Sequence, residues 1–418
     1  MLTIMHQPLY GVAMCCALSF NSLAQSQDNE VFIQQVGLNT AEVQQGINGA
    51  AASENLARLQ QNGTGNVGLI TQGNGSDAAE ATASGNVASL KQIDFDNQAE
   101  IIQGADVSEA TGNVSQVTQR DRENQATTQQ GTVSGEALRS AIELTQVGQF
   151  NQAALTQGAF FGSSTEDQVT VTQRGDNHAV VTEQGLVDGR SANNQITVRQ
   201  FTTDHQATVQ QGVRSGATER NTVSIKQEIQ GNKASVRQGV EGAATDNAAT
   251  IAQEGIGLVA LIDQGINNGG TATGNQATIE QRIGDALTAR ISQGNNFVST
   301  VNSEATIRQA GELSVATIVQ GEFEGSSQND RAVITQQGLG LEATILQGRR
   351  GATVGNEAVI SQRGFTHQAT IEQAGVTGSQ AVIEQTGDSH VASIFQSTSG
   401  QSIVLQQSGQ GSVTQIVQ

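Results

Sequence analysis

Four histidines stand at equivalent positions of a sequence repeat, and the chemistry they could do is protonation. His178 and His205 are 27 residues apart, and His367 and His390 are 23 apart, so each pair falls in adjacent repeat units. Histidine changes its charge near pH ~6.5. If adjacent units stack about 5 Å apart, protonation introduces repulsion within each pair. We therefore expect these side chains either to loosen the fold on acidification or to be simple polar replacements of asparagine.

No other group of side chains has the spacing of a catalytic or metal site. After residue 24 there is no cysteine, no phosphate-binding or dinucleotide fingerprint, no His-Glu-x-x-His and no calcium-binding nonapeptide. The Gly-x-Gly triplets at 63–65 and 73–75 are typical of bends. Asp167 and Asp330 are expected to be strand-edge residues that face water rather than an acid–base pair. The sequence predicts a protein that is not an enzyme and has no cofactor or metal.

Glutamine recurs along the whole chain at two alternating spacings, and this repeat predicts the fold. Thirty glutamines form fifteen pairs, mostly 11 residues apart within a pair and 16 between pairs, so the dominant period is 27. Six residues before each glutamine is a second column, mostly of Asn, Ser, Asp or His. Leu258, Leu287 and Leu341 interrupt this column and indicate coils with more apolar edges.

The stretch from Ser140 to Gln157 shows what one unit contains. Each half alternates with a period of two, and Ile142, Leu144 and the glutamines share a face, as in a β-strand. The unit therefore divides into a strand of seven residues, a four-residue arc, a second strand of seven and a nine-residue arc from Gly158 to Glu166. A single coil cannot bury its apolar stripe, so coils must stack.

The predicted fold is an all-β solenoid of about fifteen strand-arc-strand coils. Two parallel, in-register sheets face each other across a thin core that contains Asn and Gln ladders, in which each amide binds an equivalent amide one coil away. The side chains expected in these ladders are Gln61, Gln72, Gln119, Gln130, Gln146, Gln157, Gln173, Gln184, Gln200, Gln211, Gln227, Gln238, Asn55, Asn66, Asn113, Asn124, Ser140, Asn151, Asn221 and Asn232.

The first 24 residues differ from the repeats and predict a secretory signal peptide. Residues 9–20 are largely apolar, and Ser22 and Ala24 place small residues at the -3 and -1 positions of a cleavage site after Ala24. Residues 25–28 would then be a short mature N-terminus, and 29–418 one continuous repeat domain. We expect no membrane span in the mature chain, since the apolar run is too short.

The charge of the chain argues against nucleic acid as a partner. There are 39 acidic against 20 basic residues, which gives a net charge of -19, whereas phosphate binding requires a basic face. An ice- or polysaccharide-binding solenoid requires a flat, regular outward array, but the outward positions mix Thr with Glu, Arg and Gln. Neither class is favoured by the pattern.

The unit at 140–157 resembles the curlin repeat of bacterial curli subunits. It matches the repeat S-x5-Q-x-G-x2-N-x-A-x3-Q at Ser140, Gln146, Gly148, Asn151, Ala153 and Gln157, and related copies extend from Asn29 to Gln418. The resemblance implies a secreted, extracellular or cell-surface subunit that passes through the periplasm and polymerises into amyloid fibres of the biofilm matrix. It also implies an outer-membrane secretion channel, accessory chaperones and a nucleating subunit as partners.

This chain departs from the family pattern in its size and at its start. Curli subunits typically carry about five repeats, and here there are fifteen with longer arcs. Only residues 25–28 stand where the family's major subunit has a segment that the secretion channel reads.

Strand addition of copies of the chain at both ends is the function that the repeat predicts, because the repeat reaches Gln418 and begins close to the predicted mature N-terminus. The fibre would serve adhesion and surface attachment. The alternative is a monomeric solenoid that acts as an adhesin or surface-binding rod and does not polymerise.

Overall fold

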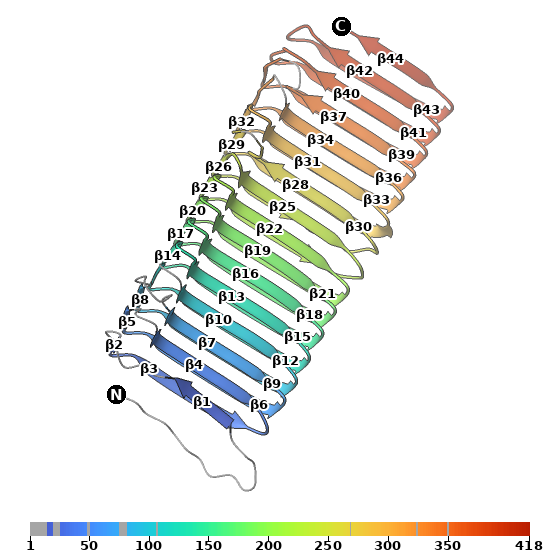
Figure 1. Cartoon of the computed structure of the whole chain (residues 1–418). Coiled ribbons are helices and arrows are strands. Elements are labelled where there is room, and N and C mark those ends of the chain that lie inside the picture. The colour runs from blue at the N-terminus through green and yellow to red at the C-terminus, as the bar shows by residue number, and fades with distance from the viewer. Residues whose placement is uncertain are drawn as a thin grey trace. The chain divides into compact units, whose positions relative to one another are not determined.

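Parallel β-strands form nearly all of the chain that the structure describes. The computed structural model describes residues 15–19, 26–47, 51–74, 82–105, 108–267, 269–322, 325–348 and 351–418. Every helix or strand assigned among these residues is a β-strand. The strands form three sheets that we call A, B and C (Figure 1). A coil consists of a strand of sheet C, then one of sheet A, then in most coils a short strand of sheet B. The prediction of an all-β solenoid with parallel, in-register sheets is confirmed.

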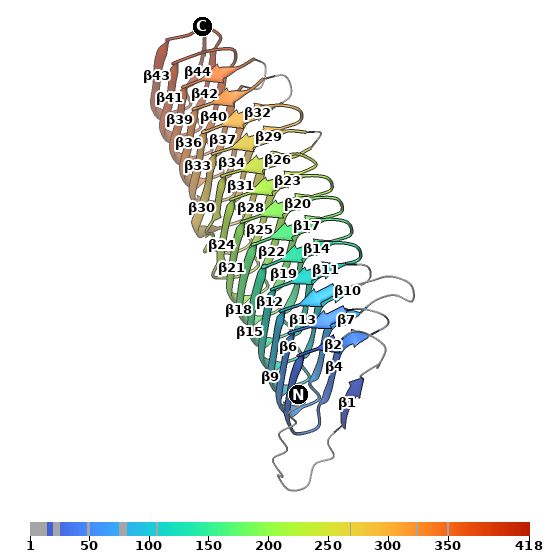
Figure 2. The ribbon, with the colours of Figure 1, turned by 90° about the vertical axis from the view of Figure 1, so that its left-hand side faces the viewer.

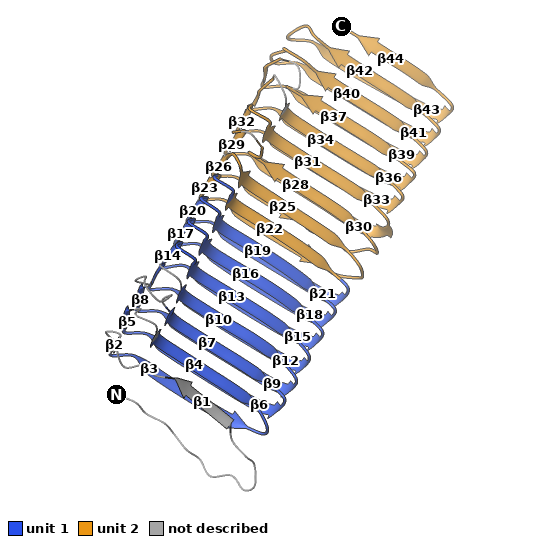
Figure 3. Ribbon diagram, in the orientation of Figure 1, with its two compact units in different colours: residues 1–204, 213–215 blue, residues 205–212, 216–418 orange. Residues whose placement is uncertain are grey.

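The chain divides into two compact units that are built from the same kind of coil (Figure 3). Unit 1 comprises residues 1–204 and 213–215, and unit 2 comprises residues 205–212 and 216–418. The expectation of one continuous domain over 29–418 stays a prediction.

Unit 1 contains seven strands in each sheet. Sheet C has β3 (Glu30–Val36), β6 (Leu56–Thr64), β9 (Val87–Phe95), β12 (Val114–Arg122), β15 (Ala141–Gln149), β18 (Gln168–Asp176) and β21 (Gln195–Thr203). Sheet A has β1 (Cys15–Ser19), β4 (Thr40–Ile47), β7 (Val67–Asn74), β10 (Gln98–Ala105), β13 (Gln125–Thr132), β16 (Gln152–Ala159) and β19 (Ala179–Leu186). Sheet B has β2 (Ser26–Gln27), β5 (Ala51–Ser53), β8 (Thr82–Ser84), β11 (Glu109–Thr111), β14 (Glu136–Leu138), β17 (Ser163–Thr165) and β20 (Arg190–Ala192).

Unit 2 repeats this arrangement with more strands in sheets A and C than in sheet B. Sheet C has β24 (Thr222–Gln227), β27 (Ala248–Ile251), β30 (Gln276–Asp285), β33 (Glu304–Glu312), β36 (Arg331–Leu339), β39 (Glu357–Phe365), β41 (Gln380–Asp388) and β43 (Ser402–Gln410). Sheet A has β22 (Gln206–Val213), β25 (Lys233–Val240), β28 (Val259–Gln264), β31 (Thr288–Asn295), β34 (Val315–Glu322), β37 (Glu342–Gln347), β40 (Gln368–Gln373), β42 (Val391–Gln396) and β44 (Val413–Val417). Sheet B has β23 (Ala217–Glu219), β26 (Ala243–Thr245), β29 (Thr271–Thr273), β32 (Ser299–Val301), β35 (Ser327–Gln328) and β38 (Thr353–Val354).

Sheet B is a feature that the sequence did not predict. The arc from Gly158 to Glu166 was expected to be a bend, but it contains β17, and the corresponding short strands follow one another along one side of each unit (Figure 2). These strands have only two or three residues, which is too short to show an alternating pattern. Only the central residue is fully buried in most of them, as Ala110 is in β11 and Ala137 in β14.

The core of a coil lies between sheets A and C, and sheet B closes its third side. In the coil of β15 and β16, Ile142, Leu144 and Leu155 are fully buried. Their partners are the equivalent residues of adjacent coils, since Ile142 pairs with Val169 and Leu144 with Val171 in register. Burying such a side chain stabilises the fold by about 1.5–3 kcal/mol, so most of the core energy of each coil depends on its neighbours.

Two glycines of this coil show what the arcs require. Gly148 in the short arc has φ +115°, and a Cβ there would lie 2.0 Å from the carbonyl oxygen of Gly175 in the next coil. Gly158 in the long arc has φ +58°, and its Cβ would lie 1.7 Å from the carbonyl oxygen of Glu136. Phe150 has φ +58° without being glycine, so the close approach of the backbones, rather than φ alone, requires glycine at 158.

Gly158→Ala should lower the stability of unit 1 by about 1–3 kcal/mol, because the added methyl group overlaps a backbone carbonyl that cannot move without distorting β14. The control is Gly112→Ala, at φ +66°, where the nearest atom is the flexible side chain of Arg139 at 3.4 Å. Thermal unfolding followed by calorimetry measures both variants. Equal losses in the two would show that φ, and not the close approach, is the constraint.

Candidate functional site: the ladder columns and the edge strands

The glutamine columns form hydrogen-bonded ladders in the interior. In sheet C, Gln119 Nε2 donates to Gln146 Oε1 at 2.9 Å, and Gln146 Nε2 donates to Gln173 Oε1 at 2.8 Å. Gln146 Nε2 also donates to the backbone carbonyl of Gln125 at 3.0 Å. The amide thus has partners for its oxygen and for both hydrogens, which offsets the cost of burying it. In sheet A of unit 1 the same bonds join Gln45, Gln72, Gln103, Gln130, Gln157 and Gln184 in order.

The asparagine columns connect each coil with the backbone of its neighbours. Asn124 Oδ1 accepts a hydrogen bond from the backbone N–H of Asn151 at 3.1 Å, and Asn151 Nδ2 donates to the carbonyl of Gly175 at 2.7 Å. In the other column, Asn113 Nδ2 donates to the carbonyl of Ala137 at 2.6 Å. The structure places all twenty side chains expected in the ladders in the interior, each at most 1% exposed.

The ladder of sheet C in unit 2 reverses its direction once. Gln281 Nε2 donates backward to Gln253 Oε1 at 2.8 Å, whereas Gln309 Nε2 donates forward to the next glutamine at 2.6 Å. The Oε1 atoms of Gln281 and Gln309 are buried without a hydrogen-bond partner. A register shift between Gln281 and Gly284 in β30 accompanies the reversal. The sequence signal for this fault is the spacing of 12 instead of 11 residues from Gln281 to Gln293.

His367 and His390 take the place of asparagine in their column and make the same two kinds of bond. His367 Nδ1 accepts from the backbone N–H of His390 at 3.2 Å, and Nε2–H donates to the carbonyl of Arg363 at 3.1 Å. His390 Nδ1 likewise accepts from the N–H of Ser412 at 3.2 Å, and its Nε2–H donates to the carbonyl of Thr386 at 3.1 Å. Each neutral ring therefore provides one acceptor and one donor, as an asparagine amide does.

The two rings are stacked, so a proton on one affects the other. Their centroids are 5.0 Å apart and their planes differ by 13°. Burial lowers the pKa of His367 below its ordinary value of 6.5, and the charge of His390 lowers it further, while the hydrogen bond to Arg363 opposes the shift. A proton on Nδ1 would also replace an acceptor by a second donor that faces a backbone N–H.

His178 and His205 occupy the same column, and each makes part of this pattern. His178 Nε2 bonds to the carbonyl of Arg174 at 3.3 Å, and His205 Nδ1 accepts from the backbone N–H of Asn232 at 3.2 Å. His178 lies in unit 1 and His205 in unit 2, and each is described within its own unit. Both side chains are at most 1% exposed.

Acidification should destabilise unit 2 through the histidine stack. Because the pKa of His367 is lowered in the fold, its contribution to stability is present above pH ~6.5 and is lost as the pH falls below that value toward the folded pKa. The variant His367→Asn/His390→Asn keeps both bonds of the column and cannot titrate, so it should lose less stability than the wild type between pH 7.5 and pH 5.5. Calorimetric unfolding at the two pH values measures this, with Thr366→Asn/Ser389→Asn as a control on the adjacent exposed residues. An unchanged pH dependence in the histidine variant would contradict the prediction.

Asp167 was expected to face water, and this prediction is wrong. Its side chain is 0% exposed because it occupies the inward asparagine column. Asp167 Oδ1 accepts from the backbone N–H of Asn194 at 2.8 Å, and Oδ2 accepts from Ser164 Oγ at 2.7 Å, with a further bond from the hydroxyl of Ser191. Burial raises the pKa of Asp167 to about 6, and the hydrogen bonds limit the rise. No charged group contributes to this shift.

Asp330 is buried in the same way, and the expectation that it faces water is also wrong. It is 1% exposed, and its Oδ1 accepts from the backbone N–H of Asn356 at 2.7 Å. Oδ2 accepts from Ser327 Oγ at 2.6 Å and from Thr353 Oγ1 at 2.5 Å. Burial raises the pKa of Asp330 as well. At both sites a Ser or Thr of sheet B replaces the alanine found at the equivalent place in β11 and β14, and supplies the donor that a carboxylate requires.

Asp167→Asn should stabilise unit 1 at pH 8 and lose this advantage in acid. Because the folded pKa is raised, the contribution of Asp167 is fully present below pH ~3.8 and is lost as the pH rises through about 6. The shift corresponds to a gain on the order of 2–3 kcal/mol for the variant at pH 8, decreasing toward zero near pH 4. Denaturant unfolding across this range measures the difference, and Asp188→Asn is the control because it removes an exposed charge in the same unit. A constant difference at all pH values would contradict the assignment.

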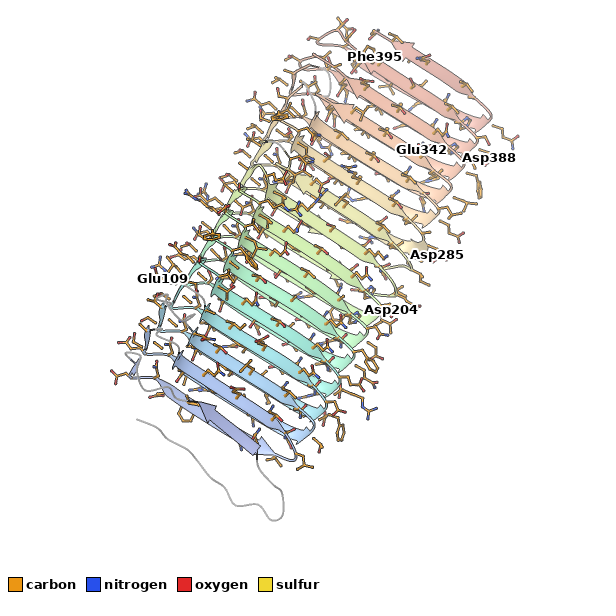
Figure 4. The ribbon with its side chains drawn as sticks, in the orientation of Figure 1. Glu109, Asp204, Asp285, Glu342, Asp388 and Phe395 are labelled. Carbon is orange, nitrogen blue, oxygen red and sulfur yellow. The ribbon has the colours of Figure 1, made fainter. Side chains whose placement is uncertain are left out.

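Charged side chains lie mainly on the outside of the coils. Asp285 and Asp388 project from the ends of β30 and β41 next to the short arcs (Figure 4). On the outer face of sheet A, Asp263 is 0% exposed because two arginines cover it. Arg237 Nε and Nη2 donate to its two oxygens at 2.7 and 2.9 Å, and Arg290 Nη2 lies 3.4 Å away. This charged group was not predicted from the sequence, although its alternating charges one coil apart are visible in the repeat.

Among the described strands of unit 2, β43 and β44 are the last in sheets C and A, and each has one neighbouring strand. β43 pairs with β41, and β44 pairs with β42. Leu405 and Ile416 point inward from these strands but are only half-buried, whereas their partners Ile383 and Ile394 in the preceding coil are 0% and 1% exposed. This coil therefore presents an incompletely covered core stripe next to a row of backbone groups with which no other described strand pairs.

Gln407 shows how the ladder terminates at this edge. Its Oε1 accepts from Gln385 Nε2 at 2.8 Å, as in the interior. Its Nε2 donates to Thr414 Oγ1 at 3.1 Å, where an interior glutamine would donate to the next glutamine. A hydroxyl of the same coil thus takes the place of a further rung.

In unit 1, β1 pairs with β4 and is the first strand of sheet A. Cys15 pairs with Thr40 and Ser19 with Gln44, in parallel. β1 belongs to the segment 1–24 that the sequence predicts as a signal peptide. The other residues of that segment, with the cleavage site after Ala24, lie outside the described residues.

Fold and ladders together define a parallel β-solenoid whose coils are joined by buried amides. A scan against protein-family models and a search of curated proteins found no match to this chain. Among the described residues there is no helix long and apolar enough to span a membrane. The same part of the chain has no group of three or more His, Cys, Asp or Glu side chains that could hold a metal ion.

Proposed function

We propose that this chain is a secreted structural subunit that polymerises end to end into extracellular, curli-like amyloid fibres of a biofilm matrix. Its role there would be adhesion and surface attachment, without catalysis. A nucleating subunit and an outer-membrane secretion channel would be its partners, as the curlin resemblance implies.

The observation that carries the proposal is the edge formed by β43 and β44. Interior coils bind each other through backbone hydrogen bonds, glutamine ladders and stacked aliphatic side chains, all in register. The coil of β43 and β44 presents backbone groups and the half-buried Leu405 and Ile416 on its uncovered side. Gln407 would extend the ladder by exchanging its bond to Thr414 Oγ1 for one to the next glutamine. A second copy that offers a coil of the same kind would find the geometry that interior coils already use.

Charge and symmetry support the same mechanism. The contact would be heterologous, since one end of a solenoid meets the opposite end of the next copy, and such contacts form open filaments. The net charge of -19 would oppose premature association in dilute solution. The alternative of a monomeric adhesin predicts that the edge does not bind a second copy.

Incubation of the chain from residue 25 to 418 should give fibres that bind thioflavin and diffract at about 4.7–4.8 Å, the spacing of stacked strands.

Leu405→Lys should slow seeded growth by about tenfold or more, because the added charge is half-exposed in one molecule but would be buried without a partner in the fibre.

Val404→Lys is the matched control, since it adds the same charge to β43 on a side chain that is already 58% exposed and points outward. Thermal unfolding of both variants establishes that the single molecule keeps its fold. Persistent monomer that cannot be seeded would overturn the proposal in favour of the monomeric adhesin. Equal growth of the two variants would show that this edge is not the site of addition.

A further inference from the structure

Two adjoining cavities lie on the outer face of sheet C in unit 2. They have volumes of about 230 and 270 Å³ and share Thr335 and Gln337 in β36. Together they extend from β30 to β41 across five consecutive strands. Their lining residues are polar or charged apart from Ala310. The first cavity exposes mainly the aliphatic parts of these side chains, whereas the second exposes mainly polar atoms. The result is an elongated groove that runs across the strands.

In-register pairing produces this groove. One column of outward residues pairs Arg308 with Thr335, Thr335 with Ser361, and Ser361 with Glu384. The parallel column pairs Ala310 with Gln337, Gln337 with Arg363, and Arg363 with Thr386. In the first column the short side chains Thr335 and Ser361 leave a trough at the middle rungs. In the second column Gln337 and Arg363 form one side of that trough.

One end of the groove coincides with the irregular part of β30. The register shift between Gln281 and Gly284 adds a residue at this point, and Ile283 is 74% exposed as a result. Gln309 lines the first cavity, and its buried Oε1 is one of the two glutamine oxygens without a hydrogen-bond partner. The groove therefore begins where the glutamine ladder is interrupted.

The groove is locally cationic on a strongly acidic chain. It contains the three arginines Arg282, Arg308 and Arg363 against the two acids Glu280 and Glu384. Glu280 is 3.5 Å from Arg282 and 3.7 Å from Arg308, which is too wide for a strong hydrogen bond. Among the described residues, Arg363 makes no ion pair. An arginine without a close acidic partner can bind a carboxylate through charge-assisted hydrogen bonds.

We propose that this groove binds an extended acidic polysaccharide. The arginines would pair with sugar carboxylates, and the hydroxyl and amide groups of Thr335, Ser361 and Gln337 would bind sugar hydroxyls. The rungs repeat every ~4.8 Å, which is close to the length of one sugar in an extended uronic acid chain, whereas an extended peptide repeats every ~3.3 Å. The sheet face has no unpaired backbone groups with which a peptide strand could pair. This is a local trough rather than the flat, regular array that the sequence argues against.

The groove lies on the outer face of a sheet, so the proposal does not depend on whether the chain polymerises. Binding of an oligomer of galacturonic acid to the chain from residue 25 to 418 is measured by calorimetric titration at low ionic strength. We expect Arg308→Gln/Arg363→Gln to weaken binding by about tenfold or more, because charge-assisted hydrogen bonds are the strongest contacts the groove offers. A neutral cello-oligosaccharide of equal length should bind weakly to both proteins.

Arg139→Gln/Arg220→Gln is the matched control. It removes the same two charges from exposed arginines outside the groove, which pair with Glu166 and Asp246 at 2.7 and 2.6 Å. We expect binding within about twofold of the wild type. Equal weakening in both double variants would show diffuse charge attraction and overturn the proposal, as would absence of binding to the wild-type chain. Polyglutamate that binds as well as the uronic acid oligomer would identify an acidic peptide site instead.

Discussion

The hydrogen bond between a buried polar side chain and the adjacent coil is the interaction on which this structure depends. Aliphatic stripes such as Ile142 and Leu144 supply most of the burial, but their contacts are non-directional and do not fix which residue stacks on which. An amide such as Gln146 must find both a donor and an acceptor in the neighbouring coils, and only the in-register arrangement supplies them. The ladders therefore set the register that the core then uses.

This dependence explains why so much of the fold could be predicted from the sequence. Glutamine and asparagine in fixed phase with Ile, Val and Leu are incompatible with an ordinary core unless identical residues stack. The positions of Gln61 and Asn66 in the interior follow from the spacing alone. The glycines that follow many ladder positions have a similar cause, since Gly148 and Gly158 lie where the backbones of adjacent coils come close together.

Two kinds of feature could not be predicted from the sequence. Some involve too few residues to show a repeating pattern, and others depend on contacts with residues elsewhere in the chain. Sheet B has strands of two or three residues, and its burial is visible only when the arc is folded. Asp167 was assigned to the surface because a carboxylate usually is. The hydroxyls of Ser164 and Ser191, separated from it by 3 and 24 residues, are what makes its burial tolerable. The direction of an amide ladder is not encoded in residue type, and only the 12-residue spacing from Gln281 to Gln293 marks the place where it reverses.

The column of Asn, Ser, Asp and His residues follows a single rule, which is that each member offers an acceptor to the backbone N–H of the next coil. Ser303 Oγ does so for Asp330 at 3.3 Å, Asp330 Oδ1 for Asn356, and His390 Nδ1 for Ser412. A donor is optional, since aspartate has none and recruits hydroxyls instead. Leu258 and Leu287 break the rule because they have no acceptor. β27, which has only four residues, lies just before Leu258, and β30, with its register shift and the unpaired oxygen of Gln281, lies between Leu258 and Leu287. Leu341 has no acceptor either, but the glutamine bond from Gln336 to Gln362 beside it is regular at 2.8 Å. The irregular ladder thus accompanies leucines in two successive coils rather than a single lost bond, as expected if the polar contacts of neighbouring coils act together to hold the register.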